Sequence, residues 1–225
     1  MNKSIGIFSF IAFIFAILAC EQPAKANYTN DNFKEKEKTM TDTTVQLDTA
    51  ILGTGCFWCT EAIFEQLKGV ESATSGYIGG DVPNPTYEQV CSGSTNHAEA
   101  ILVTYNPKEI TYDELLEVFF KVHDPTSLNK QGADVGTQYR SAIFYKNDKQ
   151  KELAEYYINK LNESGAYDKP IVTEVIAASE FYNAEDYHQD YYNILGSKNG
   201  YCQMVVKPKI EKFQKVFKDK LKVQE

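Results

Sequence analysis

Two cysteines stand three residues apart in the segment Gly55-Cys56-Phe57-Trp58-Cys59, where an apolar strand pattern gives way to a helical one. The N-terminus of a helix carries partial positive charge and free backbone N–H groups, which favour a thiolate over a thiol. The segment therefore predicts that Cys56 is a nucleophile, and its Cys-x-x-Cys spacing is that of dithiol oxidoreductases. Taken alone, the same residues also fit a buried structural cysteine followed by aromatic residues of the core.

A second group of residues lies downstream and is dense in glycines, aromatic rings and ionisable side chains. It occupies residues 76–80, 84–87, 90–93, 96–100 and 132–141. A neutral carboxylic acid flanked by phenols can bind a polar oxygen atom of a substrate and protonate it. These segments therefore predict a pocket around the nucleophile, with an acid and phenols on its walls.

The elements that must position these residues alternate irregularly between strands and helices. Strand patterns occupy residues 49–52, 70–77, 100–105, 141–145 and 171–177. Helices are expected after Cys56 as far as Gly69, from the capping box of Thr111 and Glu114, over 148–164 before Gly165, and over 208–221. This order predicts an α/β (α+β) fold in one two-layer domain with long functional loops.

The composition excludes several classes of function. Of 225 residues, 43% are hydrophobic and 13% aromatic, which is ample for one packed core. The net charge of −8 argues against a nucleic-acid surface. Five cysteines are too few for a disulfide scaffold and lack the second close pair of a zinc ribbon. The three histidines form no metal-binding pattern, so we expect neither a metal nor another cofactor.

The N-terminus has the pattern of a targeting segment. Lys3 precedes an apolar run over residues 5–19 that is short for a membrane span, and Ile17-Leu18-Ala19-Cys20 resembles the lipobox of bacterial lipoproteins. We therefore expect a signal peptide over 1–19, a lipid on Cys20, and an exported protein anchored to a membrane of the cell envelope. An uncleaved anchor and a plain secretory signal are the alternatives.

The rest of the chain divides into three parts. Residues 20–47 are polar, charged and poor in bulky apolar side chains, which predicts a disordered tether. The catalytic domain is expected over 48–206. Residues 207–225 then form an amphipathic terminal helix, because Ile210, Phe213 and Phe217 recur with helical spacing.

Seven motifs, in this order along the chain, resemble those of the peptide methionine sulfoxide reductase A family. The resemblance runs from about residue 52 to residue 202, essentially the whole folded part. So many ordered matches form a specific signal. The matching segments are 55–58 (Gly-Cys-Phe-Trp), 76–80 (Gly-Tyr-x-Gly-Gly), 84–93 (Asn-Pro-Thr-Tyr-x-x-Val-Cys-Ser-Gly), 97–100 (His-Ala-Glu-Ala), 123–125 (His-Asp-Pro), 136–141 (Gly-Thr-Gln-Tyr-Arg-Ser) and 181–189 (Phe-Tyr-x-Ala-Glu-x-Tyr-His-Gln).

The resemblance implies a central mixed sheet of ferredoxin-like plait type with helices packed on it. It also implies stereospecific reduction of the S epimer of methionine sulfoxide, free or in proteins, to methionine. The implied partners are oxidised proteins or peptides that bear methionine sulfoxide, and a thioredoxin-like reductant. Because the expected export removes the chain from cytosolic thioredoxin, a periplasmic or membrane-relayed donor of this type is expected.

Carried over by position, the resemblance also implies a role for each site residue. Cys56 attacks the sulfoxide sulfur, and Glu99 donates a proton to the sulfoxide oxygen, which Tyr87 and Tyr139 hydrogen-bond. The product is methionine and a sulfenic acid on Cys56, which a second thiol converts into a disulfide. The residues assigned to the substrate-binding walls are Phe57, Trp58 and Asp134.

Two cysteines compete for the resolving step. The commonest family pattern has glycine at position 59, whereas Cys202 matches a C-terminal resolving position, with Gln203-Met204 where further glycines are expected. Because Cys59 is close to Cys56 in the chain, its thiol has the higher effective concentration. We therefore expect Cys59 to form the first disulfide, and a relay onward to Cys202 is an open alternative. Cys91 is interpreted as a small buried hydrophobe.

Two other functions fit part of the pattern. A thioredoxin-like disulfide exchanger would use Cys56 and Cys59, but it gives the segments around Glu99 and Tyr139 no role. A non-catalytic lipoprotein that binds a partner through aromatic residues is the second. Such a protein would not need a cysteine, a carboxylate and two tyrosines at the positions that match the family motifs. Consumption of only one enantiomer of methyl p-tolyl sulfoxide separates a reductase from both.

Overall fold

The computed structural model describes residues 45–223. The expected signal peptide (1–19), the lipidated Cys20 and nearly all of the expected tether (20–47) lie outside the described residues. Over residues 45–223, no helix is both long enough and apolar enough to cross a bilayer. These residues belong to one compact unit with its own hydrophobic core.

The described residues form strands and helices that interleave along the chain. The strands are β1 (Asp48–Thr54), β2 (Val70–Ile78), β3 (Ala98–Tyr105), β4 (Lys130–Gln131), β5 (Asp134–Val135), β6 (Ser141–Tyr145), β7 (Glu174–Ala177) and β8 (Tyr182–Asn183). The α-helices are α1 (Phe57–Phe64), α2 (Tyr87–Cys91), α3 (Tyr112–Val122), α4 (Asp148–Ser164), α5 (Tyr191–Leu195) and α6 (Lys207–Val216). Short 3-10 turns cover Thr137–Tyr139, Asp186–His188, Gly196–Lys198 and Lys218–Lys220, and a π-helical stretch over Cys202–Val206 leads into α6.

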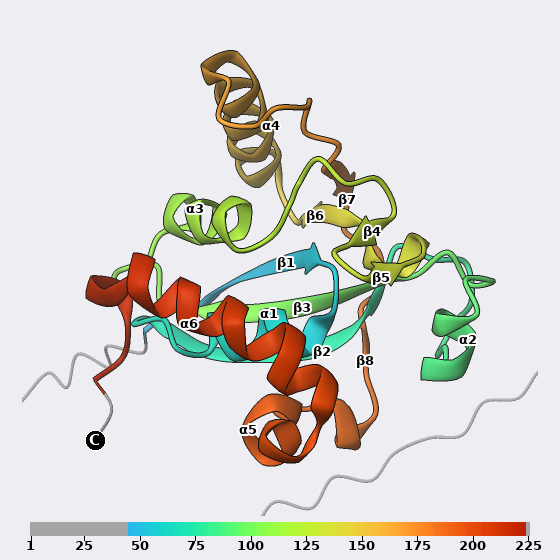
Figure 1. Cartoon of the computed structure of the whole chain (residues 1–225). Helices are drawn as coiled ribbons and strands as arrows, with labels where there is room; N and C mark the ends of the chain where they lie inside the picture. Colours follow the sequence, from blue (N-terminus) through green and yellow to red (C-terminus); the bar gives the residue numbers. More distant parts are fainter. Residues whose placement is uncertain (1–44, 224–225) are drawn as a thin grey trace, which may run out of the picture. The chain divides into compact units, whose positions relative to one another are not determined.

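Six strands form one sheet in the order β7-β6-β1-β3-β2-β8 (Figure 1). β6 and β7 pair in parallel, whereas the other neighbours pair antiparallel, so the sheet is mixed. β4 and β5 make a separate small hairpin. The expectation of a single α/β domain with a mixed central sheet is confirmed, and the finer assignment to a ferredoxin-like plait stays a prediction.

The two faces of the sheet bury different side chains, because successive residues of a strand point to opposite sides. Ala50 and Leu52 of β1 face the main core, which α1, α3 and α6 cover (Figure 1). Ile51 faces the other way, into a smaller cluster with Phe144 that is covered by Phe181 rather than by a helix. The helices therefore lie on one face of the sheet, which gives the two layers expected from the sequence.

Local signals explain where several helices begin and end. Thr111 accepts a hydrogen bond from the backbone of Glu114 and caps α3 as expected, and Gly165 takes a left-handed conformation (φ 65°) after α4. Three elements are shorter than predicted, because α1 ends at Phe64, β7 begins at Glu174 and α6 ends at Val216. The terminal helix nevertheless belongs to the main core, where Ile210 and Phe213 of α6 are buried.

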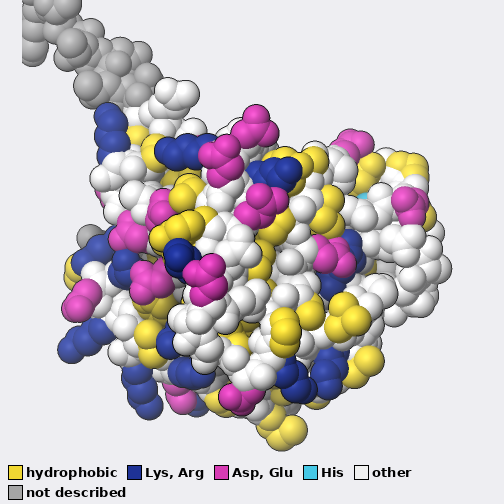
Figure 2. Space-filling model, turned by 90° about the horizontal axis from the view of Figure 1, so that it is seen from above, with side chains coloured by type: hydrophobic (Ala, Val, Ile, Leu, Met, Phe, Trp, Pro, Cys, Tyr) yellow, Lys and Arg dark blue, Asp and Glu magenta, His cyan; other side chains and the backbone are white. Residues whose placement is uncertain are grey.

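Charged groups of both signs are interspersed on the face seen in Figure 2, with apolar side chains between them. Such mixing gives this face no extended field of one sign.

Candidate active site

Cys56, the predicted nucleophile, lies where β1 ends and α1 begins. Gly55 has φ 95°, and a Cβ there would come within 2.5 Å of the Gln131 Cβ, so this tight turn requires glycine. Cys56 is the N-cap residue of α1, and its carbonyl oxygen accepts a hydrogen bond from the Thr60 hydroxyl at 3.1 Å. The turn therefore places Cys56 between the end of β1 and the start of α1.

A buried carboxyl group stands beside this turn. Glu99 of β3 is 1% exposed, and its Oε2 accepts the backbone N–H of Phe57 at 3.1 Å. Burial, and then the nearby charge of Cys56, raise the pKa of Glu99 well above its usual value. The raised pKa means that the carboxyl group keeps its proton to a higher pH than an exposed glutamate does, and it can donate that proton to an atom bound next to Cys56.

One cavity of about 220 Å³ collects all seven residues that the sequence assigns to catalysis and substrate binding. Its lining consists of Cys56, Phe57, Trp58, Tyr87, Glu99, Asp134, Tyr139 and Tyr201. Burial raises the pKa of Tyr87 and of Tyr139, so both hydroxyls stay protonated and can donate hydrogen bonds. A thiol, a neutral carboxylic acid and phenols in one cavity can attack a substrate atom and protonate the oxygen bound to it.

Tyr201 is the cavity residue that the sequence analysis missed. Its hydroxyl donates a hydrogen bond to Asp134 Oδ2 at 2.5 Å and also bonds the Cys56 thiol. The sequence feature that could have indicated Tyr201 is its position directly before Cys202.

The aromatic wall of the cavity is supported from the segment that follows β8. The ring of Trp58 stacks on Tyr191, with ring centroids 3.9 Å apart and planes 8° from parallel. The indole N–H of Trp58 donates to His188 Nδ1 at 3.1 Å, and the backbone N–H of Tyr87 donates to Glu185 at 2.9 Å. Residues 185–191 thus hold the Trp58 ring and the backbone of Tyr87 in place.

The electrostatics of the cysteine pair differ from the sequence expectation. A hydrogen bond with the Cys59 thiol, and then burial, raise the pKa of Cys56 well above its usual value, although the Trp58 backbone N–H lowers it. The same hydrogen bond lowers the pKa of Cys59. The helix N-terminus was expected to favour a thiolate on Cys56, whereas the contact with Cys59 and burial act in the opposite direction on the pKa of Cys56.

The third and fourth cysteines have different environments. Cys202 is fully buried, and its pKa is raised by burial and then by the charge of Cys56, so it already lies near the site instead of on a free segment. Cys91 is half-buried and hydrogen-bonds Tyr87, which differs from the buried hydrophobe expected. Within residues 45–223, no group of three histidine, cysteine or acidic side chains is arranged to hold a metal ion.

Comparison with known proteins places this site in a family. The family profile of peptide methionine sulfoxide reductase matches residues 48–221. The chain is 54% identical over 173 residues to the peptide methionine sulfoxide reductase MsrA of Natronomonas pharaonis, covering 77% of this chain and 97% of that protein. It is 50% identical over 179 residues to the enzyme of the same name from Saccharolobus solfataricus, covering 80% and 99%.

Solved structures agree with the sequence comparison. Methionine sulfoxide reductase A of Corynebacterium diphtheriae has a TM-score of 0.59 at 40% identity, over 65% of this chain and 74% of that one. Mxr1 from Saccharomyces cerevisiae in reduced form has a TM-score of 0.62 at 36% identity, over 73% of this chain and 94% of that one. The chain therefore belongs to the peptide methionine sulfoxide reductase family.

Proposed function

We propose that this chain is a peptide-methionine (S)-S-oxide reductase, which reduces the S epimer of methionine sulfoxide to methionine. The observation that carries the proposal is that the Cys56 thiol and the buried Glu99, whose pKa burial raises, share one cavity. Sulfur attack on a sulfoxide is difficult unless the oxygen is protonated, and Glu99 holds a proton where that oxygen would lie. Family membership supports the same reaction.

The reaction uses the cavity residues in sequence. The Cys56 thiol loses its proton and attacks the sulfoxide sulfur, Glu99 protonates the oxygen, and Tyr87 and Tyr139 hydrogen-bond it. Oxygen passes to the Cys56 sulfur, which becomes a sulfenic acid, and the substrate sulfur gains two electrons. Phe57 and Trp58 enclose the methyl group of the substrate, which can be free methionine sulfoxide or a residue of an oxidised protein.

Cys59 is the first resolving thiol in this proposal. Its hydrogen bond with Cys56 and its lowered pKa support a thiolate that attacks the sulfenic acid, releases water and forms a Cys56–Cys59 disulfide. A thioredoxin-like dithiol then reduces the enzyme, either directly or after Cys202 has taken over the disulfide. Mass spectrometry after one turnover identifies the pair, and a first disulfide between Cys56 and Cys202 would contradict this order.

The test of the activity is stereochemical. The enzyme should consume only one enantiomer of methyl p-tolyl sulfoxide, with dithiothreitol as reductant, because an asymmetric cavity presents the sulfur to Cys56 from one side only. Chiral chromatography of the remaining sulfoxide measures this. Equal consumption of both enantiomers, or none of either, would refute the proposal, whereas disulfide exchange without sulfoxide reduction would favour a thioredoxin-like exchanger.

We further propose that the protein is an exported lipoprotein held to a membrane of the cell envelope through Cys20. The lipobox-like residues 17–20 and the polar segment that follows them support this. Metabolic labelling with a fatty acid should mark the parent protein and spare Cys20→Ala, which should stay unprocessed or become soluble. A parent protein that carries no acyl group and never partitions with membranes would contradict the anchor.

A further inference from the structure

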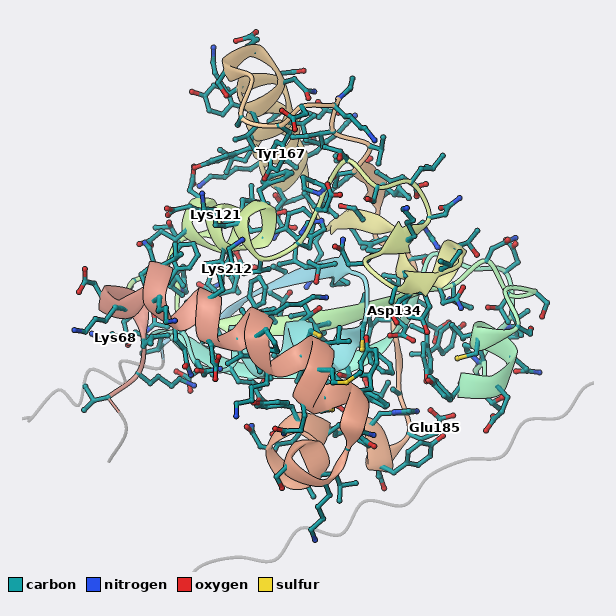
Figure 3. All side chains as sticks on the ribbon, viewed as in Figure 1. Lys68, Lys121, Asp134, Tyr167, Glu185 and Lys212 are labelled. Atoms are coloured by element: carbon teal, nitrogen blue, oxygen red, sulfur yellow. The ribbon has the colours of Figure 1, made fainter. Side chains whose placement is uncertain are left out.

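A second concave surface lies between α3 and α6, outside the catalytic cavity. Two adjoining cavities of about 280 and 420 Å³ share the walls of this surface, which we call the lysine groove. The lysine groove is defined by Lys121, His123, Lys209, Lys212, Val216 and Phe217. Figure 3 shows Lys121 and Lys212 close together between the two helices, with Tyr167 above them.

The groove carries positive charge that is not neutralised. Lys121, Lys209 and Lys212 have no carboxylate within 4.0 Å among residues 45–223. Two carboxylates stand at its rim: Asp124 accepts from the Thr126 and Ser127 hydroxyls, which leave its negative charge in place, and Glu117 lies 3.7 Å from Lys220.

The charge of this region opposes that of the whole protein. Residues 207–222, on the α6 side of the groove, hold seven lysines against Glu211 and Asp219, a net charge of +5, whereas the chain as a whole carries −8. On the α3 side, Lys121 stands with Asp113, Glu114 and Glu117. Such a local basic surface on an acidic protein attracts an acidic partner.

The groove also has an apolar floor. Phe213 and Phe217 are 2% and 5% exposed beneath it, and Val216 at its edge is 50% exposed. A partner that sets an apolar side chain on this floor and carboxylates on the lysines would match both features.

The inner end of the groove adjoins the redox-active cysteines. Gln131 lines the groove and packs against the Gly55 turn, while Asp134, its partner in the β4–β5 hairpin, lines the catalytic cavity. The charge of Lys209 reaches Cys59, whose pKa it helps to lower. One short hairpin therefore separates the groove from the site at which the enzyme must be re-reduced.

We propose that the lysine groove is the docking surface for the protein that re-reduces this enzyme, an acidic dithiol donor of thioredoxin type. The proposal rests on the function proposed above, which requires a dithiol donor to complete each cycle. One donor thiolate attacks the enzyme disulfide and forms a mixed disulfide, which the second donor thiol then breaks. Two electrons and two protons pass to the enzyme cysteines, and the donor leaves as a disulfide.

The test reverses charge in the groove and compares two reductants. Lys121→Glu combined with Lys212→Glu should raise the KM for an acidic thioredoxin about tenfold, since rim charges act mainly on the encounter of two proteins. Turnover with dithiothreitol should not change, because neither lysine lines the catalytic cavity. Added salt should raise the thioredoxin KM of the parent more than that of the variant.

A matched control carries the same charge change elsewhere. Lys108→Glu combined with Lys149→Glu alters two exposed lysines outside the groove, and it should leave the thioredoxin KM within about twofold of the parent. If the reversed groove destabilises the fold, Lys121→Gln with Lys212→Gln should still raise this KM, by a smaller factor.

The outcomes separate the two proposals. Failure of the parent to reduce sulfoxide with dithiothreitol refutes the proposed function. Normal dithiothreitol turnover with the same thioredoxin KM in parent, groove variant and control refutes the docking surface alone. Binding of the parent to phosphatidylglycerol vesicles that is lost in the groove variant, with an unchanged thioredoxin KM, would assign the groove to a lipid surface and overturn the proposal.

Discussion

The catalytic cavity has two walls that are built in different ways. The inner wall consists of Cys56, Phe57 and Glu99, which are at most 6% exposed and lie on the sheet and the first turn of α1. The outer wall consists of Tyr87, Asp134, Tyr139 and Tyr201, which are half-buried and come from short elements and loops. Backbone ladders and core packing fix the inner wall, whereas side-chain hydrogen bonds such as Tyr201 to Asp134 hold the outer one.

This contrast separates reactivity from shape. The inner wall holds the proposed nucleophile and proton donor; contact with Cys59 and then burial raise the pKa of Cys56, and burial raises that of Glu99. The outer wall supplies hydrogen bonds and boundaries, and it can shift by small amounts because few backbone bonds restrain it. Substitutions in the inner wall should therefore remove chemistry, and those in the outer wall should mainly change binding.

The largest effect is expected for Cys56→Ser in the inner wall. A hydroxyl is a far weaker nucleophile than a thiolate, so reduction of methionine sulfoxide should fall below detection while the fold stays intact. Methionine formation in a single turnover measures the activity, and the melting temperature checks the fold. Clear residual turnover by a folded Cys56→Ser variant would place the nucleophile elsewhere.

Glu99→Gln should have the next largest effect, because it removes the proton donor and retains the shape of the side chain. The step that forms the sulfenic acid should slow by roughly two to four orders of magnitude. Rapid-quench kinetics on the first turnover isolate this step. Glu88→Gln, an exposed carboxyl on α2, is the control and should keep the parent rate; equal rates in all three proteins would remove Glu99 from the mechanism.

The same Glu99→Gln variant should become more stable relative to the parent as the pH rises. Burial holds the folded pKa of Glu99 well above its unfolded value, so ionisation favours the unfolded chain at every pH above the unfolded pKa of about 4.3. The parent loses stability as the pH rises towards the folded pKa, and glutamine does not. Urea unfolding at pH 4, 6 and 8 should show a difference that grows with pH; a constant difference would mean that Glu99 is not protonated in the fold.

The smallest effect is expected in the outer wall, for Tyr201→Phe. Loss of the hydrogen bonds to Asp134 and to the Cys56 thiol should lower kcat/KM about tenfold or less, which corresponds to roughly 1.4 kcal/mol, within the usual range for a side-chain hydrogen bond. Steady-state kinetics over a range of methionine sulfoxide concentrations should place most of the change in KM. Tyr156→Phe, at an exposed tyrosine of α4, is the control. A loss as large as that of Glu99→Gln would make Tyr201 part of the chemistry and contradict the contrast between the walls.

The local sequence was sufficient to predict those turns and helix ends that depend only on neighbouring residues. The turn at Gly55, the capping box at Thr111 and the end of α4 at Gly165 depend on a few adjacent residues, and the structure has each of them. The helix α2 was missed although Thr86 and Gln89 form a capping box that the sequence already contains. Cys56 and Glu99 were likewise named from motifs, because residue type and order are properties of the chain alone.

Tertiary structure decided the features that depend on distance and burial. The helix end was expected to favour a thiolate on Cys56, but contact with Cys59 and removal from water raise its pKa. Tyr201 and the buried Cys202 lie next to the site although they are far from Cys56 in the chain. Solvation energy and the separation of charges are set by neighbours far away in the chain, so no local pattern encodes them.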